Sequence, residues 1–337
     1  MSTQNAIAET NTQLQAAPSL VQDLFGEQAG DSVQVFHPQQ AEVLEAFGQT
    51  VRVLLSGATT DNRVSVMEVD VPAQEGPPPH IHHDEDETFL VKQGRFEFWL
   101  NGETTEVGEG DIVYGPRDVP HTFRNIGEEN ALLQVFAISA GFESFFRGCA
   151  HIWGSENVMP QVMQIAQAHN LEFVDPSTTP RVAVPANGKT PRIVRKGEGE
   201  ALATPNGSGL VAVSESDTAG DFALGWMNIA PLGGPTYHVH HCEDEIFVVQ
   251  GGSFEYSTTG RRLRAEAGDV VWLPRDVPHA FRCVSAEGGQ LLGILAPGGF
   301  VNYFRESAQL FANGQLTEAR IDALNTGYGI EYLPPSS

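Results

Sequence analysis

The sequence predicts an all-β protein of two tandem domains, each a small sandwich or barrel with short flanking helices. Short runs of β-branched and aromatic residues follow one another with turn residues between them, and no helical pattern is interleaved, which is typical of such folds. The second half of the chain also repeats the first, with His238 standing 158 positions after His80. A repeat of this size indicates a duplicated domain, because solenoid units are much shorter.

The strands of the first half are read from runs rich in β-branched and apolar residues. These runs are residues 51–55, 64–71, 88–91, 96–100, 111–114 and 132–138. Asn101-Gly102 lies between two of them and predicts a type I′ hairpin turn. Beyond Gly141, residues 145–147 and 157–170 suit helices, and residues 171–174 suit a returning strand.

The domain boundaries follow from the repeat and from the composition. Residues 1–30 are polar and weakly patterned, which predicts a flexible N-terminal arm; packing on a partner subunit is the alternative. We expect a first domain at residues 31–176 and a second at residues 190–335. Residues 177–189 between them are rich in Pro and Thr and are expected to form a linker.

The composition is that of a strongly acidic globular protein, with 41% hydrophobic residues and a formal net charge of −24. Such a surface repels phosphate groups, so we expect neither nucleic acid nor membrane as a partner. The start of the chain lacks the features of a secretory signal, and no apolar run approaches the roughly 18 residues of a membrane span. We therefore expect a cytoplasmic protein, with self-association into a homo-oligomer left open.

Each half contains three histidines and one glutamate in the same order. They are His80, His82, Glu87 and His121 in the first half, and His238, His240, Glu245 and His279 in the second. Side chains two positions apart on a strand point to the same side, so two imidazoles converge if that side is the interior. A single histidine is usually a surface or packing residue, but the repetition of four such residues outweighs that alternative.

Three neutral imidazoles and one carboxylate suit a divalent transition metal ion with an open coordination position, which is typical of catalytic sites. The sequence therefore predicts one metal ion in each domain. Fe, Mn, Ni, Co, Cu and Zn all accept these ligands, and the ligand types do not choose among them.

The spacing of these residues resembles the motifs of the cupin superfamily. His80, His82, Glu87 and Gly94 match the first cupin motif, and Gly110, Pro116, His121 and Asn125 match the second. The second half matches them again through His238, His240, Glu245, Gly252, Gly268, Pro274 and His279. The chain is thus similar to the bicupins over nearly all of both domains. The resemblance implies two double-stranded β-helix, or jelly-roll, domains with the metal ion inside.

The chain departs from the family pattern in three places. Gly76 lies closer to the histidine pair than the usual glycine, Asp118 and Asp276 stand where glycine is common, and Cys283 replaces an asparagine. None of these departures removes a metal ligand.

Among bicupins, the chain resembles the bacterial quercetin 2,3-dioxygenases in length, in the run Gly197–Glu200 and in the segment Ala296–Arg305. This resemblance implies a dioxygenase that cleaves a flavonol, or a related aromatic or enolic substrate, with O2 and releases carbon monoxide. Glu87 and Glu245 are the candidate catalytic bases for the substrate hydroxyl. The candidate residues for the walls of an aromatic pocket are Phe89, Phe123, Phe247 and Phe281. Ordinary packing in the barrel core is the alternative.

Other functions stay open. An oxalate-type decarboxylase would need a cationic or hydrogen-bonding pocket for a small dianion, and no extra arginine cluster is evident near the predicted ligands. A non-catalytic, metal-binding regulatory bicupin would keep the same ligands. We expect Arg117-Asp118 and Arg275-Asp276 to form loop ion pairs that contribute little stability. Because the halves differ at Phe98 and Tyr256, their activities can differ too.

Overall fold

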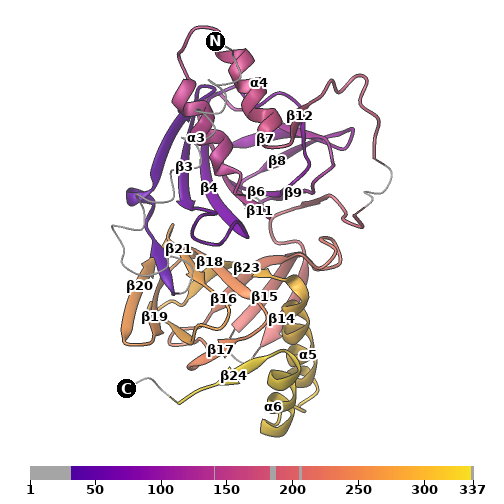
Figure 1. Ribbon diagram of the computed structural model, residues 1–337. Coiled ribbons are helices and arrows are strands. Elements are labelled where there is room, and N and C mark those ends of the chain that lie inside the picture. Colours follow the sequence, from indigo (N-terminus) through magenta and orange to yellow (C-terminus); the bar gives the residue numbers. More distant parts are fainter. Residues whose placement is uncertain (1–31, 140, 183–186, 205–206, 335–337) are drawn as a thin grey trace, which may run out of the picture.

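The computed structural model describes residues 32–139, 141–182, 187–204 and 207–334. The predicted N-terminal arm at residues 1–30 lies outside the described residues. Each half of the chain forms a five-stranded antiparallel sheet and six strands of a seven-stranded one, and the two halves are stacked one on the other (Figure 1). This architecture confirms the prediction of two tandem jelly-roll domains.

In the first domain, the seven-stranded sheet has the order β13-β9-β6-β11-β4-β3-β2 and the five-stranded sheet the order β12-β5-β10-β7-β8. The bounds are β2 (Glu42–Ala46), β3 (Gln49–Leu55), β4 (Val64–Val71), β5 (His80–His82), β6 (Asp86–Gln93), β7 (Arg95–Leu100), β8 (Glu103–Gly108), β9 (Ile112–Gly115), β10 (His121–Asn125), β11 (Ala131–Ile138), β12 (Leu171–Phe173) and β13 (Arg192–Val194). Asn101 and Gly102 both have positive φ, of 51° and 83°, which confirms the predicted turn between β7 and β8.

The second domain repeats this arrangement, with sheets β1-β21-β18-β23-β16-β15-β14 and β20-β19-β22-β17-β24. The bounds are β1 (Gln34–Phe36), β14 (Glu200–Thr204), β15 (Gly207–Val213), β16 (Ala223–Ile229), β17 (His238–His240), β18 (Asp244–Gly251), β19 (Ser253–Thr258), β20 (Arg261–Glu266), β21 (Val270–Leu273), β22 (His279–Cys283), β23 (Gly289–Ala296) and β24 (Ile330–Tyr332).

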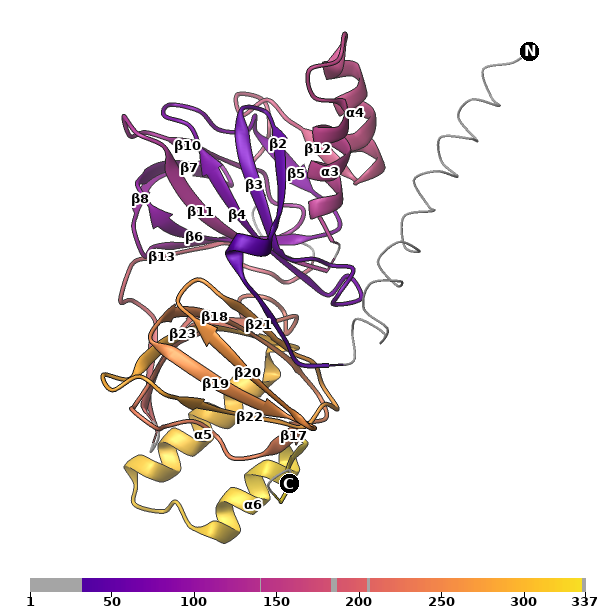
Figure 2. The ribbon, with the colours of Figure 1, turned by 90° about the vertical axis from the view of Figure 1, so that its left-hand side faces the viewer.

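A pair of helices follows the last long strand of each domain. They are α3 (Glu143–Ile152) and α4 (Val158–Ala168) in the first domain, and α5 (Val301–Ala312) and α6 (Glu318–Gly327) in the second. Each pair lies beside the edge where the short strand β12 or β24 returns to the five-stranded sheet (Figures 1 and 2). In the described part of the chain, no helix combines the length and the apolar character needed to cross a bilayer.

The two domains exchange edge strands. β1 pairs antiparallel with β21 of the second domain, while β13 pairs with β9 of the first. Figure 2 shows the chain passing from β1, beside the lower domain, up into the first domain. The boundaries 31–176 and 190–335 remain our proposal for the chain segments that form the domains, and each segment contributes one strand to the sheet of the other.

The two seven-stranded sheets also share a hydrophobic core between the domains. Leu90, Tyr114 and Phe136 of the first sheet are buried together with Trp272 and Ile294 of the second. A sheet buried on both faces has strands that are apolar at nearly every position, as in β11, where seven of the eight residues are buried. The sheet that holds the glutamate of each predicted metal site is therefore fixed between two cores.

Candidate metal centres

The first predicted ligand set is brought together between the two sheets of its domain. His80, His82 and His121 come from β5 and β10 of the five-stranded sheet, while Glu87 comes from β6 of the seven-stranded sheet. One ligand atom from each residue lies within 4.8 Å of those of the others, and all four residues are buried. His80 and His121 are direct cross-strand partners, so the strand register itself places their rings side by side.

The second set is built in the same way. His238 and His240 lie on β17, His279 begins β22 and Glu245 lies on β18. Their ligand atoms also lie within 4.8 Å of one another, and all four residues are buried. Each domain thus has one His₃Glu cluster that can hold a metal ion.

Hydrogen bonds behind the rings orient all six histidines. The Nδ1 atoms of His80 and His121 lie 2.8 Å and 3.0 Å from the carbonyl oxygens of Pro78 and Val119. Those of His238 and His279 lie 2.7 Å and 2.9 Å from the carbonyl oxygens of Thr236 and Val277. A carbonyl can only accept, so Nδ1 carries the proton and Nε2 presents its lone pair to the cluster.

Two glutamates complete this outer set. Glu85 accepts a hydrogen bond from His82 Nδ1, and Glu243 does the same for His240. Sequence reasoning did not assign them a role, although their position three residues after a ligand histidine is a usable signal. Both side chains are buried, so each holds its histidine in a fixed orientation.

The donor atoms fit a divalent cation. His82 Nε2 is buried and makes no hydrogen bond, although Glu87 Oε2 lies 3.1 Å away. In the second domain the Nε2 atoms of His238 and His240 face each other at 2.9 Å. Since their Nδ1 atoms donate outward, two lone pairs converge there, and a cation shared by both is the arrangement that satisfies them.

Burial and neighbouring charges set the protonation of the clusters. Burial lowers the pKa of His80 well below its ordinary value and that of His238 to about 3, so both are neutral donors. Burial opposes the ionisation of Glu245, but His240 and His279 lower its pKa to about 2. Burial would lower the pKa of His82, but the charges of Glu87 and Glu85 raise it to about 9. Metal binding to His82 therefore releases a proton.

Replacing Glu85 by Gln is expected to weaken metal binding in the first domain by about 10- to 100-fold, because the outer partner of His82 loses its charge. A competition titration with a chelator measures this loss. Glu243→Gln is the matched variant and should weaken only the second site. Unchanged affinity in both variants would contradict the role given to these glutamates.

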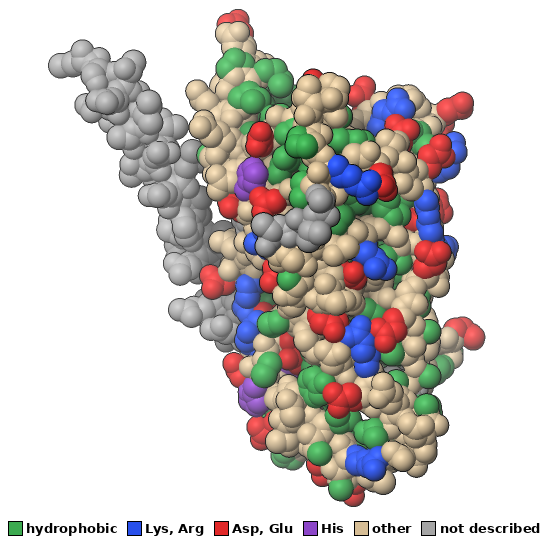
Figure 3. Space-filling model, turned by 90° about the vertical axis from the view of Figure 1, so that its right-hand side faces the viewer, with side chains coloured by type: hydrophobic (Ala, Val, Ile, Leu, Met, Phe, Trp, Pro, Cys, Tyr) green, Lys and Arg blue, Asp and Glu red, His purple; other side chains and the backbone are tan. Residues whose placement is uncertain are grey.

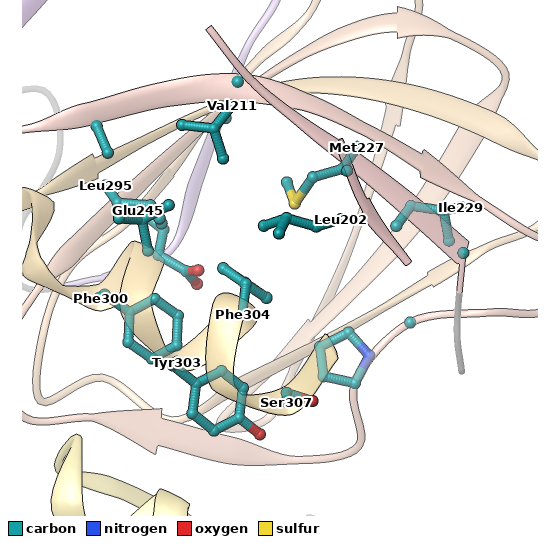
Figure 4. Close-up of a pocket in the computed structure, with 18 of the residues that line it drawn as sticks. Leu202, Val211, Met227, Ile229, Glu245, Leu295, Phe300, Tyr303, Phe304 and Ser307 are labelled. Atoms are coloured by element: carbon teal, nitrogen blue, oxygen red, sulfur yellow. The ribbon is translucent and has the colours of Figure 1, made fainter. Parts of the chain in front are cut away.

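A cavity opens onto each cluster. The first has a volume of about 310 Å³ and is lined by His80 and Glu87, with Phe89 and Phe123 among its walls. The second has a volume of about 290 Å³ and is lined by His238, His240 and Glu245, with Phe247 and Phe281 among its walls (Figure 4). All four predicted pocket phenylalanines therefore lie beside the clusters.

The predicted ion pairs Arg117–Asp118 and Arg275–Asp276 are wrong. Asp118 has a positive φ of 65°, a conformation that glycine adopts readily, which explains why glycine is common at this position. Its carboxylate accepts a hydrogen bond from His83 on the exterior. Arg117 turns inward instead, with its Nε 3.0 Å from Oδ1 of the buried Asp86. Asp276 and His241 repeat the exterior contact.

Asp86 and Asp244 are the centres of two buried charge clusters between the domains. Lys189, from the segment expected to be a linker, contacts Asp86 and also lies 2.6 Å from Asp221 of the second domain. At Asp244, the counterpart of Asp86, Arg63 of the first domain makes the contact, and Arg275 also binds Asp244 at 2.8 Å. Asp86 thus binds a cation from the segment between the domains, and Asp244 binds one from the other domain; each acid directly precedes a ligand glutamate.

A family model described as a cupin domain matches residues 67–138 and 225–295. Each matched segment contains one complete His₃Glu cluster. The chain is a bicupin. It is 24% identical to the quercetin 2,3-dioxygenase of Bacillus subtilis over 273 residues, which are 76% of this chain and 80% of that protein.

Solved bicupin structures have the same architecture. Oxalate decarboxylase from Bacillus subtilis at pH 4.6 aligns with a TM-score of 0.57 at 15% identity, over 93% of this chain and 92% of that one. The formate complex of Lactobacillus farciminis oxalate decarboxylase aligns with a TM-score of 0.56 at 12% identity, over 86% of this chain and 95% of that one. At such low sequence identities, these alignments show that the chain has the bicupin fold. Its activity has to be inferred from the residues of the site.

Proposed function

We propose that this bicupin is a metal-dependent dioxygenase that cleaves a flavonol, or a related aromatic or enolic substrate, with O2. The observation that carries the proposal is a buried His₃Glu cluster at the end of an apolar, aromatic cavity in each domain. The likeness to a quercetin 2,3-dioxygenase over three quarters of the chain supports the same substrate class.

The proposed ligands are the eight residues of the two clusters. A divalent ion bound there supplies Lewis acidity and a template for the substrate. Glu87 and Glu245 line the cavities as carboxylates whose pKa values are lowered by adjacent histidines. Each accepts the proton of the substrate hydroxyl in this proposal, which leaves an electron-rich enolate able to reduce dioxygen.

The aromatic side chains that line each pocket bind the substrate in this proposal. Phe89 and Phe123 pack edge to face with ring centroids 5.7 Å apart, and Phe247 and Phe281 repeat this at 5.5 Å. Such walls receive a flat aromatic ring and exclude water from the enolate. The partners of the reaction are a small aromatic molecule and O2, and we propose that it takes place in the cytoplasm.

An oxalate-type decarboxylase is the second candidate because the solved structures that align include such enzymes. Oxalate is a small dianion. A divalent ion held by three neutral imidazoles and one carboxylate leaves a single positive charge to compensate it, so its burial requires a further cation. Among the described residues that line the two metal-cluster cavities, none is Lys or Arg. The cavity chemistry therefore favours an aromatic substrate over oxalate.

Carbon monoxide release from an aerobic flavonol tests the proposal. The protein is stripped with a chelator, reloaded separately with Mn, Fe, Co, Ni, Cu or Zn, and mixed with quercetin or with oxalate. We expect carbon monoxide in proportion to quercetin consumed with at least one metal, and no decarboxylation of oxalate. Absence of carbon monoxide with every metal would contradict the proposal.

A further inference from the structure

We propose that the two pockets differ in chemistry and that the pocket of the second domain is the one that selects a hydroxylated aromatic substrate, through Tyr303 and Tyr332. This inference rests on the proposed function and assigns its substrate recognition to one of the two sites. The internal duplication provides the comparison, because each residue of one pocket has a counterpart in the other.

The aromatic residues at the start of α3 and α5 are arranged alike next to the clusters. The ring of Phe300 packs edge to face on His240 at 4.7 Å, and Phe142 packs in the same way on His82 at 4.5 Å. Phe300 then stacks on Tyr303 at 5.1 Å, where Phe142 stacks on Phe145 at 5.2 Å. The ring positions are thus shared, and the phenol hydroxyl is the difference.

Two phenols line the second pocket beside its cluster. The ring of Tyr332 stacks on the ligand His238 at 5.6 Å, whereas its counterpart in the first domain is Phe173. The Tyr303 hydroxyl donates a hydrogen bond to Oδ1 of the buried Asn325 at 3.2 Å, and it lies close to the Tyr332 hydroxyl. Figure 4 shows Tyr303 next to Phe300, on the same side of the open space as the Glu245 carboxylate.

The first pocket has no equivalent hydroxyl groups. Its described lining contains neither Tyr nor Ser nor Thr, whereas the second also includes Ser208 and Ser307. The two volumes, about 310 and 290 Å³, are nearly equal. Hydroxyl groups therefore distinguish the pockets, and size does not.

The two pockets also differ in the strands that line them. Gly209 on β15 and Gly225 on β16 line the second pocket, where the first domain has Val51 and Met67, which are fully buried in its core. The second pocket therefore differs from the first in its strand side chains as well as in its hydroxyl groups.

Positioned hydrogen-bonding groups discriminate more strongly than apolar walls. A site that binds a substrate hydroxyl rejects the analogue without it, since its own polar groups are then left unpaired, while an apolar pocket barely distinguishes the two. We therefore expect the second pocket to prefer quercetin over 3-hydroxyflavone, which lacks the other ring hydroxyls. The first pocket should show little preference.

Anaerobic titration of zinc-loaded protein tests this assignment, because binding is read without turnover. We expect one tight quercetin equivalent per chain. His80→Ala with His121→Ala should retain it, and His238→Ala with His279→Ala should lose it. Tyr303→Phe with Tyr332→Phe should raise the Kd for quercetin about tenfold, roughly the loss of one hydrogen bond, and change that for 3-hydroxyflavone less than twofold.

Tyr328→Phe is the matched control. Its hydroxyl bonds to Glu306 at 2.6 Å, and it does not line the cavity, so the Kd for quercetin should change less than twofold. Phenylalanine already occupies the positions of Tyr303 and Tyr332 in the first domain, so the double variant is compatible with the fold. Unchanged quercetin affinity in that variant, or retention of the tight equivalent without the second cluster, would overturn the assignment. Carbon monoxide release would still support the proposed function in that case; a protein that neither binds quercetin nor releases carbon monoxide contradicts both.

Discussion

Replacing Glu87 and Glu245 together by Gln is expected to lower kcat for flavonol cleavage by about 10²- to 10⁴-fold, while both domains keep a metal ion. The amide cannot accept the substrate proton, and this range is the usual contribution of a positioned base. Three histidines held by outer hydrogen bonds remain as ligands in each cluster. Steady-state rates and elemental analysis of the same preparations measure both effects.

Glu172→Gln is the control, because this side chain lies outside the barrel and is 62% exposed. It should leave kcat within twofold of the parent value. If only one site turns over, the single variants identify it, and the assignment of substrate recognition to the second pocket predicts the larger loss in Glu245→Gln. Undiminished turnover in the double variant would exclude both glutamates as the base.

Replacing Lys189 by Met is expected to lower the free energy of unfolding by about 3 kcal/mol. Asp86 is fully buried, and removing one partner of a buried ion pair leaves charge without compensation. Arg117 remains in contact with Asp86, so the domains should stay folded at 25 °C. Urea denaturation followed by circular dichroism measures the change.

Lys196→Met is the matched control, since this side chain is exposed. Its effect should stay within about 0.5 kcal/mol. The comparison separates the buried charge cluster from the loss of a positive charge on a strongly acidic chain. Equal stabilities of the two variants would show that Lys189 does not stabilise the junction between the domains.

The strands and the ligand clusters were predictable from the sequence because their signals are local or repeated. Alternating burial in β7, where Phe96, Phe98 and Leu100 face the core, produces a strand pattern of period two. Asn101-Gly102 predicted the hairpin because this pair of residues is typical of a type I′ turn. The ligands were found because the same four residue types recur in one order in both halves.

The contacts between the domains were not predictable in the same way. β11 is apolar on both faces except at Gln134, and that pattern does not reveal that the face with Phe136 packs on the other domain. β1 and β13 are three residues long, too short for a pattern to assign them to a sheet. Lys189 lies in a segment whose composition is typical of a linker, yet its side chain is buried.

The three consecutive acids Glu85, Asp86 and Glu87 show this limit most clearly. All three are buried, and the fold gives each a different partner: a ligand histidine, a cation at the domain junction, and the proposed metal ion. Their chemistry is nearly identical, so strand register and the second domain decide among them. Charged residues on the surface are not sorted in this way: acidic and basic side chains are interspersed over the face seen in Figure 3.

A metal count on site-specific variants tests the central claim, that each domain holds one divalent ion on its His₃Glu cluster. Chelator-stripped protein is reloaded with Mn, freed of excess metal and analysed for metal and protein. We predict two ions per chain in the parent protein, one in His80→Ala with His121→Ala, one in His238→Ala with His279→Ala, and none when the four substitutions are combined. Well under one ion per chain in the parent protein, or counts that do not change among these variants, would contradict the claim.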